Sequence, residues 1–337
     1  MRRAPKKLLE GTHSRTYFTA GIFKSGVKKS GYSFVEKGVK CMTGFVFLDK
    51  GEGMTSFFAA SRLRRIFGTK KIGHTGTLDP MATGVLPIAL GGATKFIELI
   101  PDHDKAYKAS FRLGLTTDTL DITGEVLSQS EVDVSAEQVE KALDSFRGEI
   151  KQLPPMYSAI KKDGVRLYEL ARQGIEVERE ERLITVYSLA LSGSDEEKNE
   201  YEITVECSKG TYIRSLIADI GEALGCGATM TALRRIKANG VTIDKCYTVA
   251  QLEQMKEKNE LSDALNSVDS FISYDKIKVS EAQSRRFSNG GELDCNRFGG
   301  KKEPGLYCVY SPVGKFLGVG EIDENREKLS VKRVYVE

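Results

Sequence analysis

Residues 73–96, GHTGTLDPMATGVLPIALGGATKF, constrain the fold of this 337-residue chain more than any other segment. Glycines and prolines interrupt every helical or strand-like period in it, at Gly73, Gly76, Pro80, Gly84 and Pro87. We therefore expect a structured loop rather than a helix or a strand. Such a loop can hold an acid, an imidazole and hydroxyls in fixed positions, and its glycines let a substrate backbone approach closely. Pro80 also biases the preceding Asp79 towards extended backbone geometry.

The rest of the sequence carries strand-like and helix-like patterns without a strict strand–helix–strand alternation. Strands are expected at residues 45–48, 107–115, 183–191 and 201–208. One helix is expected after the N-cap residue Thr55, with Phe58, Leu63, Ile66 and Phe67 as its apolar positions. Others are expected from Ser135, which opens a Ser-x-x-Gln capping pattern, and over residues 211–224. This pattern is typical of an α+β domain with a mixed, mainly antiparallel sheet.

The chain is expected to divide into a body, residues 42–250, and several flanking or inserted parts. Residues 156–182 are rich in Lys and Arg with interleaved tyrosines, and predict a surface insertion, here called the basic insertion. Residues 251–276 are polar and predict a connecting helix and linker. Residues 277–337 contain short strand patterns separated by Gly, Pro and charged turns, and predict a small β-rich domain.

The first 41 residues differ from the body in charge. They hold ten Lys or Arg against Glu10 and Glu36, a net charge of +8, which leaves −5 for the rest of a chain whose total is +3. Without a sustained amphipathic period, they fit a disordered basic arm that binds RNA. They also fit a transit peptide. Our preferred hypothesis is a third one, that translation begins at Met42.

Composition excludes several classes of protein. No apolar run approaches the roughly 20 residues that a bilayer requires, so we expect no membrane span. The six cysteines form no Cys-x-x-Cys pair and only three histidines accompany them, so no metal site is expected. Scattered cysteines fit a reducing compartment, and we expect a cytoplasmic protein. Net charge does not indicate nucleic acid, but local clusters do: the basic insertion and Arg62, Arg64 and Arg65, just before residues 73–96.

Residues 73–87, GHTGTLDPMATGVLP, closely resemble the active-site motif of the TruB family of tRNA pseudouridine synthases, whose catalytic aspartate falls on Asp79. An isolated Leu-Asp-Pro would favour a simple turn, because short motifs match by chance. Further blocks resemble the family in its own order, at residues 45–56, 104–126, 156–177 and 207–235. So many ordered blocks are not expected by coincidence.

The resemblance implies chemical roles for particular residues. Asp79 would be the catalytic carboxylate, which attacks C1′ or C6 of a uridine or assists a glycal route; the sequence leaves the route open. Tyr107 matches the tyrosine that stacks on the target base and helps to remove the C5 proton, although a strand tyrosine also fits a core position. Arg214 matches the arginine that pairs with the aspartate and orients it.

Other matches imply contacts with the RNA. Tyr212 and Leu233 match residues that line the uracil pocket. His74 matches an imidazole placed against the T-loop, and Lys50 resembles a lysine near the site, although it also fits a strand-end surface charge. The basic insertion resembles an RNA-gripping thumb. Its cations are suited to phosphate contacts, together with those of the predicted helix: Lys161, Lys162, Arg166, Arg172, Arg179, Arg182, Arg62, Arg64 and Arg65. Thr77 departs from the family, which often has a smaller residue there.

The resemblance also implies an architecture and an activity. Residues 42–250 would form the pseudouridine synthase domain, and residues 277–337 are more weakly similar to a PUA domain that touches the acceptor end of tRNA. We expect isomerisation of the uridine at position 55 in the tRNA T-loop after base flipping, without metal or organic cofactor. We also expect a monomer that needs no protein partner.

Three rival interpretations remain. A guide-RNA-dependent pseudouridine synthase of the box H/ACA type belongs to the same superfamily, but the thumb-like insertion argues against it. A noncatalytic tRNA-folding chaperone could use the same scaffold. A glycosidase that uses Asp79 is disfavoured, because no second carboxylate in these blocks has an evident acid/base placement.

Overall fold

The computed structural model describes residues 42–298, 303–325 and 327–336. All three interpretations of residues 1–41, as an RNA-binding arm, a transit peptide or an upstream start, concern residues outside this described part. Among the described residues, no helix has both the length and the apolar character needed to cross a membrane.

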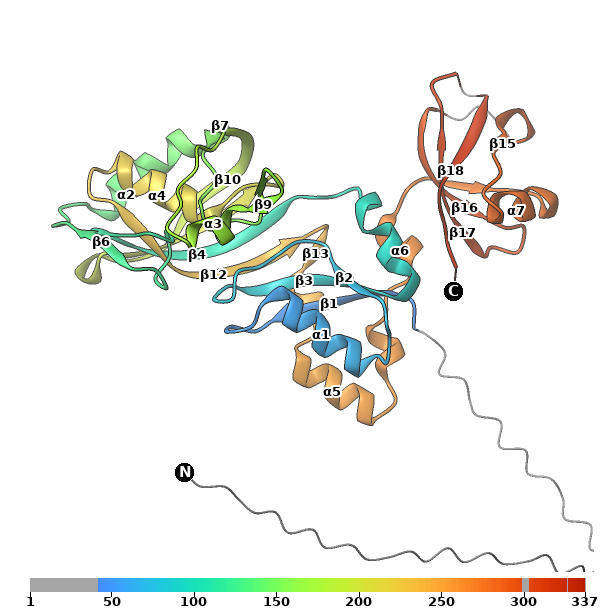
Figure 1. Ribbon diagram of the computed structural model, residues 1–337, viewed down its shortest axis with the longest axis horizontal. Coiled ribbons are helices and arrows are strands. Elements are labelled where there is room, and N and C mark those ends of the chain that lie inside the picture. The colour runs from blue at the N-terminus through green and yellow to red at the C-terminus, as the bar shows by residue number, and fades with distance from the viewer. Residues whose placement is uncertain (1–41, 299–302, 326, 337) are drawn as a thin grey trace, which may run out of the picture. The chain divides into compact units, whose positions relative to one another are not determined.

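A large sheet forms the body and is mixed but mainly antiparallel, as predicted (Figure 1). Its strands are β1 (Gly44–Lys50), β2 (Ile72–His74), β3 (Thr83–Leu90), β4 (Lys105–Leu113), β7 (Gly148–Gln152), β10 (Arg182–Asp195), β11 (Glu200–Cys207), β12 (Ala228–Ala238) and β13 (Val241–Thr242). The main path runs β1-β3-β12-β4-β11-β10-β7, with β2 paired to β3 and β13 to β12. Only β3 and β12 pair in parallel among these strands, so β12 joins the two halves of the sheet.

Three smaller sheets accompany the large one. Two are hairpins, β5 (Leu115–Thr117) with β6 (Val126–Gln129), and β8 (Lys161–Lys162) with β9 (Val165–Arg166). The third contains β14 (Lys276–Lys278), β15 (Leu293–Asp294), β16 (Gly305–Tyr310), β17 (Phe316–Ile322) and β18 (Lys328–Val334). This C-terminal sheet has its own buried cluster, which includes Phe287, Val309 and Leu329. It also contacts the body, where Phe96 lies 6.0 Å from Phe316 between ring centroids.

The helices are short and lie between the strands. The α-helices are α1 (Ser56–Ile66), α2 (Ala136–Leu143), α3 (Leu167–Ala171), α4 (Ile213–Ala223), α5 (Val249–Glu257), α6 (Val268–Ile272) and α7 (Glu281–Ser288). The 3-10 helices are η1 (Gly91–Leu99), η2 (Asp144–Phe146), η3 (Glu196–Lys198), η4 (Ile243–Lys245), η5 (Leu261–Ala264) and η6 (Cys295–Arg297). Two expected caps are confirmed: Thr55 accepts a hydrogen bond at the start of α1, and Ser135 forms a capping box with Gln138 on α2.

The prediction that residues 73–96 avoid regular structure is wrong for much of the segment, because β3 and η1 occupy residues 83–99. Pro87 is tolerated within β3 by its position. The first two residues of β3 pair with β12 and the last three with β2, so Pro87 lies where the strand changes neighbours. On the β1 side of β3, Pro87 lies opposite Phe47, and the Phe47 carbonyl accepts its hydrogen bond from the Tyr247 N–H rather than from residue 87. The missing N–H of the proline therefore removes no ladder bond.

The apolar face of α1 also differs from the prediction. Phe58 was expected on the buried face, but it is 53% exposed. The other expected positions, Leu63, Ile66 and Phe67, are buried, together with Ser56, Ala59 and Ala60. These positions follow the spacing of one helical face, and Phe58 does not share it.

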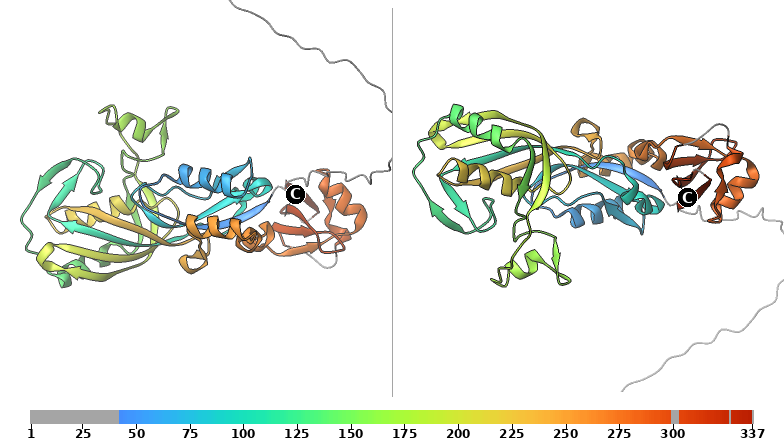
Figure 2. Two further views of the ribbon diagram at one scale, coloured as in Figure 1. Left: turned by 90° about the horizontal axis from the view of Figure 1, so that it is seen from below. Right: turned by 90° about the horizontal axis from the view of Figure 1, so that it is seen from above.

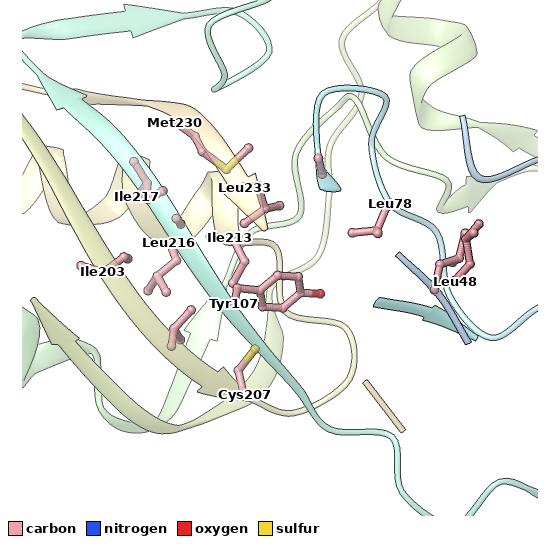
Figure 3. Packing of buried hydrophobic residues seen from close by; sticks show 14 of the residues in the cluster. Leu48, Leu78, Tyr107, Ile203, Cys207, Ile213, Leu216, Ile217, Met230 and Leu233 are labelled. Atoms are coloured by element: carbon pink, nitrogen blue, oxygen red, sulfur yellow. The ribbon is translucent and has the colours of Figure 1, made fainter. Parts of the chain in front are cut away.

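The main core lies where α4 packs on β12 and β4 (Figure 3). Ile213, Leu216 and Ile217 of α4 meet Ile203 and Cys207 of β11 and Met230 and Leu233 of β12. Tyr107 of β4 lies among these residues, and its hydroxyl points to the side on which Leu78 lies. The core therefore reaches the irregular segment that follows β2.

The basic insertion stands apart from this core. Before β10 begins at Arg182, it contains the two-residue strands β8 and β9 and the five-residue helix α3. Figure 2 shows this part of the chain projecting from the large sheet, on the same side as α1. Most of its basic side chains are exposed: Lys161, Lys162, Arg166, Arg172 and Arg182.

Candidate active site

Within residues 73–96, only residues 75–82 have no regular structure, and Asp79 lies among them. This part is here called the Asp79 loop. Neighbouring residues hold this loop from the side of β1 and α1. Leu78 exchanges two hydrogen bonds with the Ser56 hydroxyl, donating at 2.8 Å and accepting at 3.1 Å. The Pro80 carbonyl accepts from Gly53 N–H at 2.9 Å. The flanking backbone is fixed, while the Asp79 side chain remains 37% exposed and open to a ligand.

Arg214 forms an ion pair with Asp79, with 3.0 Å between Nη2 and Oδ2. Its side chain is only 6% exposed, and it donates to the carbonyls of Thr119 and Tyr157 at 2.9 Å each. Arg214 lies in the first turn of α4, where a positive charge is unfavourable for the helix dipole. Its carboxylate neighbours offset that cost, and its carbonyl partners fix the guanidinium against Asp79.

Asp121 is a site residue that the sequence reasoning missed. Its carboxylate is buried, with Oδ2 at 3.7 Å from Nη1 of Arg214. Oδ1 accepts hydrogen bonds from the Thr119 hydroxyl and the Thr123 N–H at 3.0 Å each. Arg214 therefore lies between two carboxylates, one open to solvent and one enclosed. The signal that could have found Asp121 is the Thr-x-Asp-x-Thr spacing, which lets both threonines cap one carboxylate.

Tyr107 is 6% exposed on β4 and lies opposite Arg235 of β12. Burial raises the pKa of its hydroxyl, while the charge of Arg235 and a hydrogen bond from it act in the opposite direction. Leu233, on the same strand as Arg235, is also buried. The structure therefore brings Tyr107 and Leu233 together in an apolar wall whose polar edge is the tyrosine hydroxyl.

Arg235 itself was not among the expected site residues. It is 1% exposed and is the largest fully buried side chain of the described residues. Its Nε donates to the Val85 carbonyl at 2.7 Å, and its Nη atoms donate to the carbonyls of Thr77 and Gly76 at 3.3 Å each. In sequence it resembles any other arginine, so only the strand register reveals that it is buried.

Lys50 is buried rather than a surface charge at a strand end. Its Nζ donates to the carbonyls of Met54 at 2.8 Å, Gly51 at 3.0 Å and Pro80 at 3.3 Å. Burial is the main cause that lowers its pKa to about 8, and the Asp79 carboxylate acts in the opposite direction. Lys50 is therefore a second buried cation that holds the backbone next to Asp79.

His74 and Tyr212 lie at the margins of this centre. His74 ends β2, directly before the Asp79 loop, and its Nδ1 is buried with no hydrogen-bond partner among the described residues. Burial and the nearby charge of Arg235 lower its pKa, which favours the neutral imidazole. Tyr212 is the N-cap of α4, and its backbone exchanges two hydrogen bonds with the Gln152 side chain.

The expected RNA-backbone residues fall into two separate groups. Arg62, Arg64 and Arg65 lie on α1, where Arg62 pairs with Glu253 of α5 at 2.6 Å. The second group lies on the basic insertion and is exposed: Lys161, Lys162, Arg166 and Arg172. Arg179 and Arg182 were named with them, but Arg179 turns inward to the Pro154 carbonyl. Among the described residues, no cluster of His, Cys, Asp and Glu could hold a metal ion.

Comparison with known proteins identifies the family. The N-terminal domain model of the TruB family of pseudouridylate synthases matches residues 64–213, and the C-terminal domain model of tRNA pseudouridylate synthase B matches residues 214–273. The chain belongs to the TruB family. The boundary between the two TruB matches separates the candidate residue Asp79 from Arg214, and the fold brings the two together.

TruB relatives match most of this chain and nearly all of their own length. The tRNA pseudouridine synthase B of Clostridium perfringens is 46% identical over 292 residues, which span 86% of this chain and 98% of that protein. That of Escherichia coli is 43% identical over 307 residues, spanning 88% and 96%. The solved Cbf5-Nop10-Gar1 complex contains a chain that matches with a TM-score of 0.66 and 25% identity, over 87% of this chain and 85% of that one. The archaeal box H/ACA Nop10-Cbf5 complex gives 0.65 and 24%, over 87% and 86%.

Proposed function

We propose that this chain isomerises the uridine at position 55 in the T-loop of tRNA to pseudouridine, acting as a monomer without a guide RNA or a protein partner. The Asp79–Arg214 pair carries the proposal, because it joins an accessible carboxylate to a fixed guanidinium within a TruB chain. The choice of tRNA is supported by relatives named tRNA pseudouridine synthase B at 43–46% identity over nearly their whole length. Position 55 and the T-loop follow from the resemblance of the Asp79 segment to the family motif.

The reaction breaks the bond between N1 and C1′ of the uridine, forms a bond between C5 and C1′, and moves one proton from C5 to N1. Asp79 supplies the carboxylate for this exchange, either as a nucleophile at C1′ or C6 or as a partner in a glycal route. Arg214 orients that carboxylate through its own fixed contacts. No metal or organic cofactor takes part in this scheme.

The target base would enter the space beside Tyr107. A flipped base needs a stacking surface and a dry wall, and Tyr107, Tyr212 and Leu233 are suited to provide them. The Tyr107 hydroxyl points towards the side of the Asp79 loop, from which it can assist removal of the C5 proton (Figure 3). His74, neutral and directly before that loop, is suited to stack or hydrogen-bond beside the flipped nucleotide.

The remaining basic surface would hold the rest of the tRNA. The basic insertion projects on the same side of the large sheet as α1, so cations from both are available to the T-arm backbone (Figure 2). The C-terminal sheet, β14 to β18, would act as a PUA-like module at the acceptor end. The scattered cysteines fit reducing surroundings, from which we infer a cytoplasmic enzyme.

The decisive experiment incubates purified chain with unmodified tRNA and maps pseudouridine chemically. We expect modification at position 55 without any added RNA or protein. We expect Asp79→Asn to slow the reaction by at least about 1000-fold while tRNA affinity changes little. Activity that appears only with a guide RNA would favour the box H/ACA type. Retained activity in Asp79→Asn would exclude the proposed chemistry. If the wild type and Asp79→Asn both refolded tRNA and neither isomerised uridine, the protein would be a chaperone.

A further inference from the structure

We propose that Arg235 is a positioning residue for isomerisation, because its guanidinium fixes the Asp79 loop against β3 and so presents the carboxylate to the uridine. The inference rests on the proposed role of Asp79. Arg235 comes from β12, reaches the Val85 carbonyl of β3 with Nε, and reaches the Thr77 and Gly76 carbonyls of the loop with its two Nη atoms. One side chain therefore ties the irregular loop to the sheet.

A role in packing alone does not explain why the buried residue at position 235 carries a charge. In the described part of the chain, its hydrogen-bond partners are carbonyl oxygens and the Tyr107 hydroxyl, and none of them is a carboxylate. Burying a guanidinium without a counter-charge is costly, and an apolar side chain would fill the same space more cheaply. What the guanidinium adds is a rigid fork of donors that can bind acceptors on two elements at once.

Arg235 binds a part of the loop that the other contacts leave out. Thr75 is held at the start of the loop by the Pro87 carbonyl and by Asn239. Ser56 holds Leu78, and Lys50 and Gly53 hold Pro80, all from the region of β1 and α1. Residues 76 and 77 are held by Arg235. They precede Leu78 and Asp79, so these two hydrogen bonds fix the backbone that leads into the catalytic position. Without them, the segment before Asp79 could shift and carry the carboxylate with it.

Strand packing around Arg235 is itself close. Gly84 of β3 has a φ of +102°, and a Cβ at that position would overlap the Arg235 carbonyl. This glycine therefore allows β3 and β12 to approach, which brings the Arg235 side chain within reach of the Val85 carbonyl on the next residue of β3. The placement of Arg235 is built into the backbone of both strands.

Arg234 provides a matched control. It is the preceding residue of β12, but its side chain faces Asp49, with hydrogen bonds of 2.8 and 3.1 Å to the two carboxylate oxygens. It is 43% exposed and contacts Thr83 rather than the Asp79 loop. Arg234→Lys and Arg235→Lys therefore make the same chemical change on one strand, and only the second removes the fork that binds the loop.

The first test measures single-turnover isomerisation of tRNA and tRNA affinity for the full chain and both variants. We expect Arg235→Lys to slow isomerisation by about 100-fold with affinity within about threefold of wild type, because small misplacements of a reacting group carry this cost. In Arg234→Lys, the isomerisation rate and the tRNA affinity should both stay within about threefold of wild type. Arg235→Gln, which keeps only one amide group as donor, should behave like Arg235→Lys. An Arg235→Lys rate near wild type, or an equal reduction in Arg234→Lys, would overturn the proposal.

A second substrate separates loop positioning from an effect through Tyr107. 5-Fluorouridine at the target position has no proton at C5, so its consumption reports bond breaking without proton removal. We expect Arg235→Lys to slow its consumption as much as that of uridine. A reduction confined to uridine would assign Arg235 to proton removal and would contradict loop positioning.

Hydrogen exchange tests the position of the loop without any substrate. Amides of the Asp79 loop, such as Leu78 N–H, which donates to Ser56, should exchange at least about tenfold faster in Arg235→Lys and not in Arg234→Lys. Unchanged exchange in Arg235→Lys would defeat the positioning role whatever the activity. An inactive wild-type chain would defeat the proposed function alone.

Discussion

Arginine and lysine are concentrated both around Asp79 and in the basic insertion. The first group, with Asp79 itself, is here called the Asp79 centre and contains Lys50, Arg214 and Arg235. The two regions differ in how these cations are bound. In the centre, Arg214 and Arg235 are 6% and 1% exposed, and backbone carbonyls bind them from several elements. In the insertion, Arg166 and Arg172 are exposed and lie over the ring of Tyr168, at 5.8 and 5.4 Å from its centroid. Cations of the first kind are enclosed and bound by several elements, whereas those of the second are exposed and have at most local partners, such as the Tyr168 hydroxyl for Arg166 and the Glu178 carbonyl for Lys162.

This difference predicts which measured quantity each kind of mutation should change. A buried cation bound to several acceptors acts through position, so its removal should lower the rate of the bound complex. An exposed cation acts through charge, so its removal should lower affinity and the dependence of affinity on salt. Rate and affinity measured separately should therefore distinguish the two regions.

The largest effect in this comparison is expected from Arg214→Met. The change leaves the Thr119 and Tyr157 carbonyls without their donor and Asp121 as a buried carboxylate without a counter-charge. We expect single-turnover isomerisation to fall by about 100- to 1000-fold. The free energy of unfolding should fall by about 3–5 kcal/mol, the usual cost of breaking a buried ion pair, as measured by urea denaturation.

Asp121→Asn in the Arg214→Met background separates these two effects. The asparagine removes the buried charge, so most of the stability should return. The rate should remain low, because Asp79 still lacks the guanidinium that orients it. Recovery of the rate together with stability would show that Arg214 acts on folding and not on the carboxylate.

Sequence information was sufficient wherever the signal was local. The Thr55 cap and the Ser135 capping box each depend on residues within four positions of one another, and both appear in the structure. The mixed, mainly antiparallel sheet followed from the order of strand-like and helix-like segments. The residues named at the centre came largely from the family resemblance.

What the sequence missed depends on contacts between distant segments. Pro87 seemed to exclude a strand, yet it lies where β3 changes neighbours and costs no hydrogen bond. Asp121 and Arg235 read as ordinary charged residues, because their burial depends on distant partners: Arg235 lies opposite Tyr107 of β4, and Asp121 pairs with Met230 of β12. Lys50 fitted either a site lysine or a surface charge, and only the surrounding carbonyls show that it is buried.

An intermediate effect is expected from the titration of Lys50. Its pKa is lowered from 10.5 to about 8, mainly by burial, so the charged form is depleted as the pH rises through about 8. If the charge holds Pro80 beside Asp79, single-turnover isomerisation should fall about tenfold by one pH unit above that value. Lys50→Arg keeps its charge and should flatten this part of the profile; an identical decline in both chains would exclude Lys50 as the cause.

The same titration has the opposite sign for stability. The unfolded chain binds the Lys50 proton more tightly than the folded chain, so between about pH 8 and 10.5 this residue makes the folded state more stable as the pH rises. A decline in activity in that window is therefore not a consequence of unfolding caused by Lys50. Thermal denaturation at about pH 7.5 and about pH 9, on either side of this pKa, should show a smaller pH-dependent gain in Lys50→Arg than in wild type.

The smallest effect is expected from the basic insertion, where Lys161→Gln and Lys162→Gln are combined. Both side chains are exposed on the β8–β9 hairpin, so their removal should leave the fold and the centre intact. The dissociation constant for tRNA should rise a few fold, and the slope of its logarithm against log salt should fall by about one for each phosphate that the variant no longer neutralises. Isomerisation at saturating enzyme should not change.

Lys141→Gln, on the exposed side of α2, is the matched control and should alter neither the tRNA affinity nor the rate at saturation. A lower rate at saturation would show that the insertion positions the substrate, and the contrast with the Asp79 centre would then not hold.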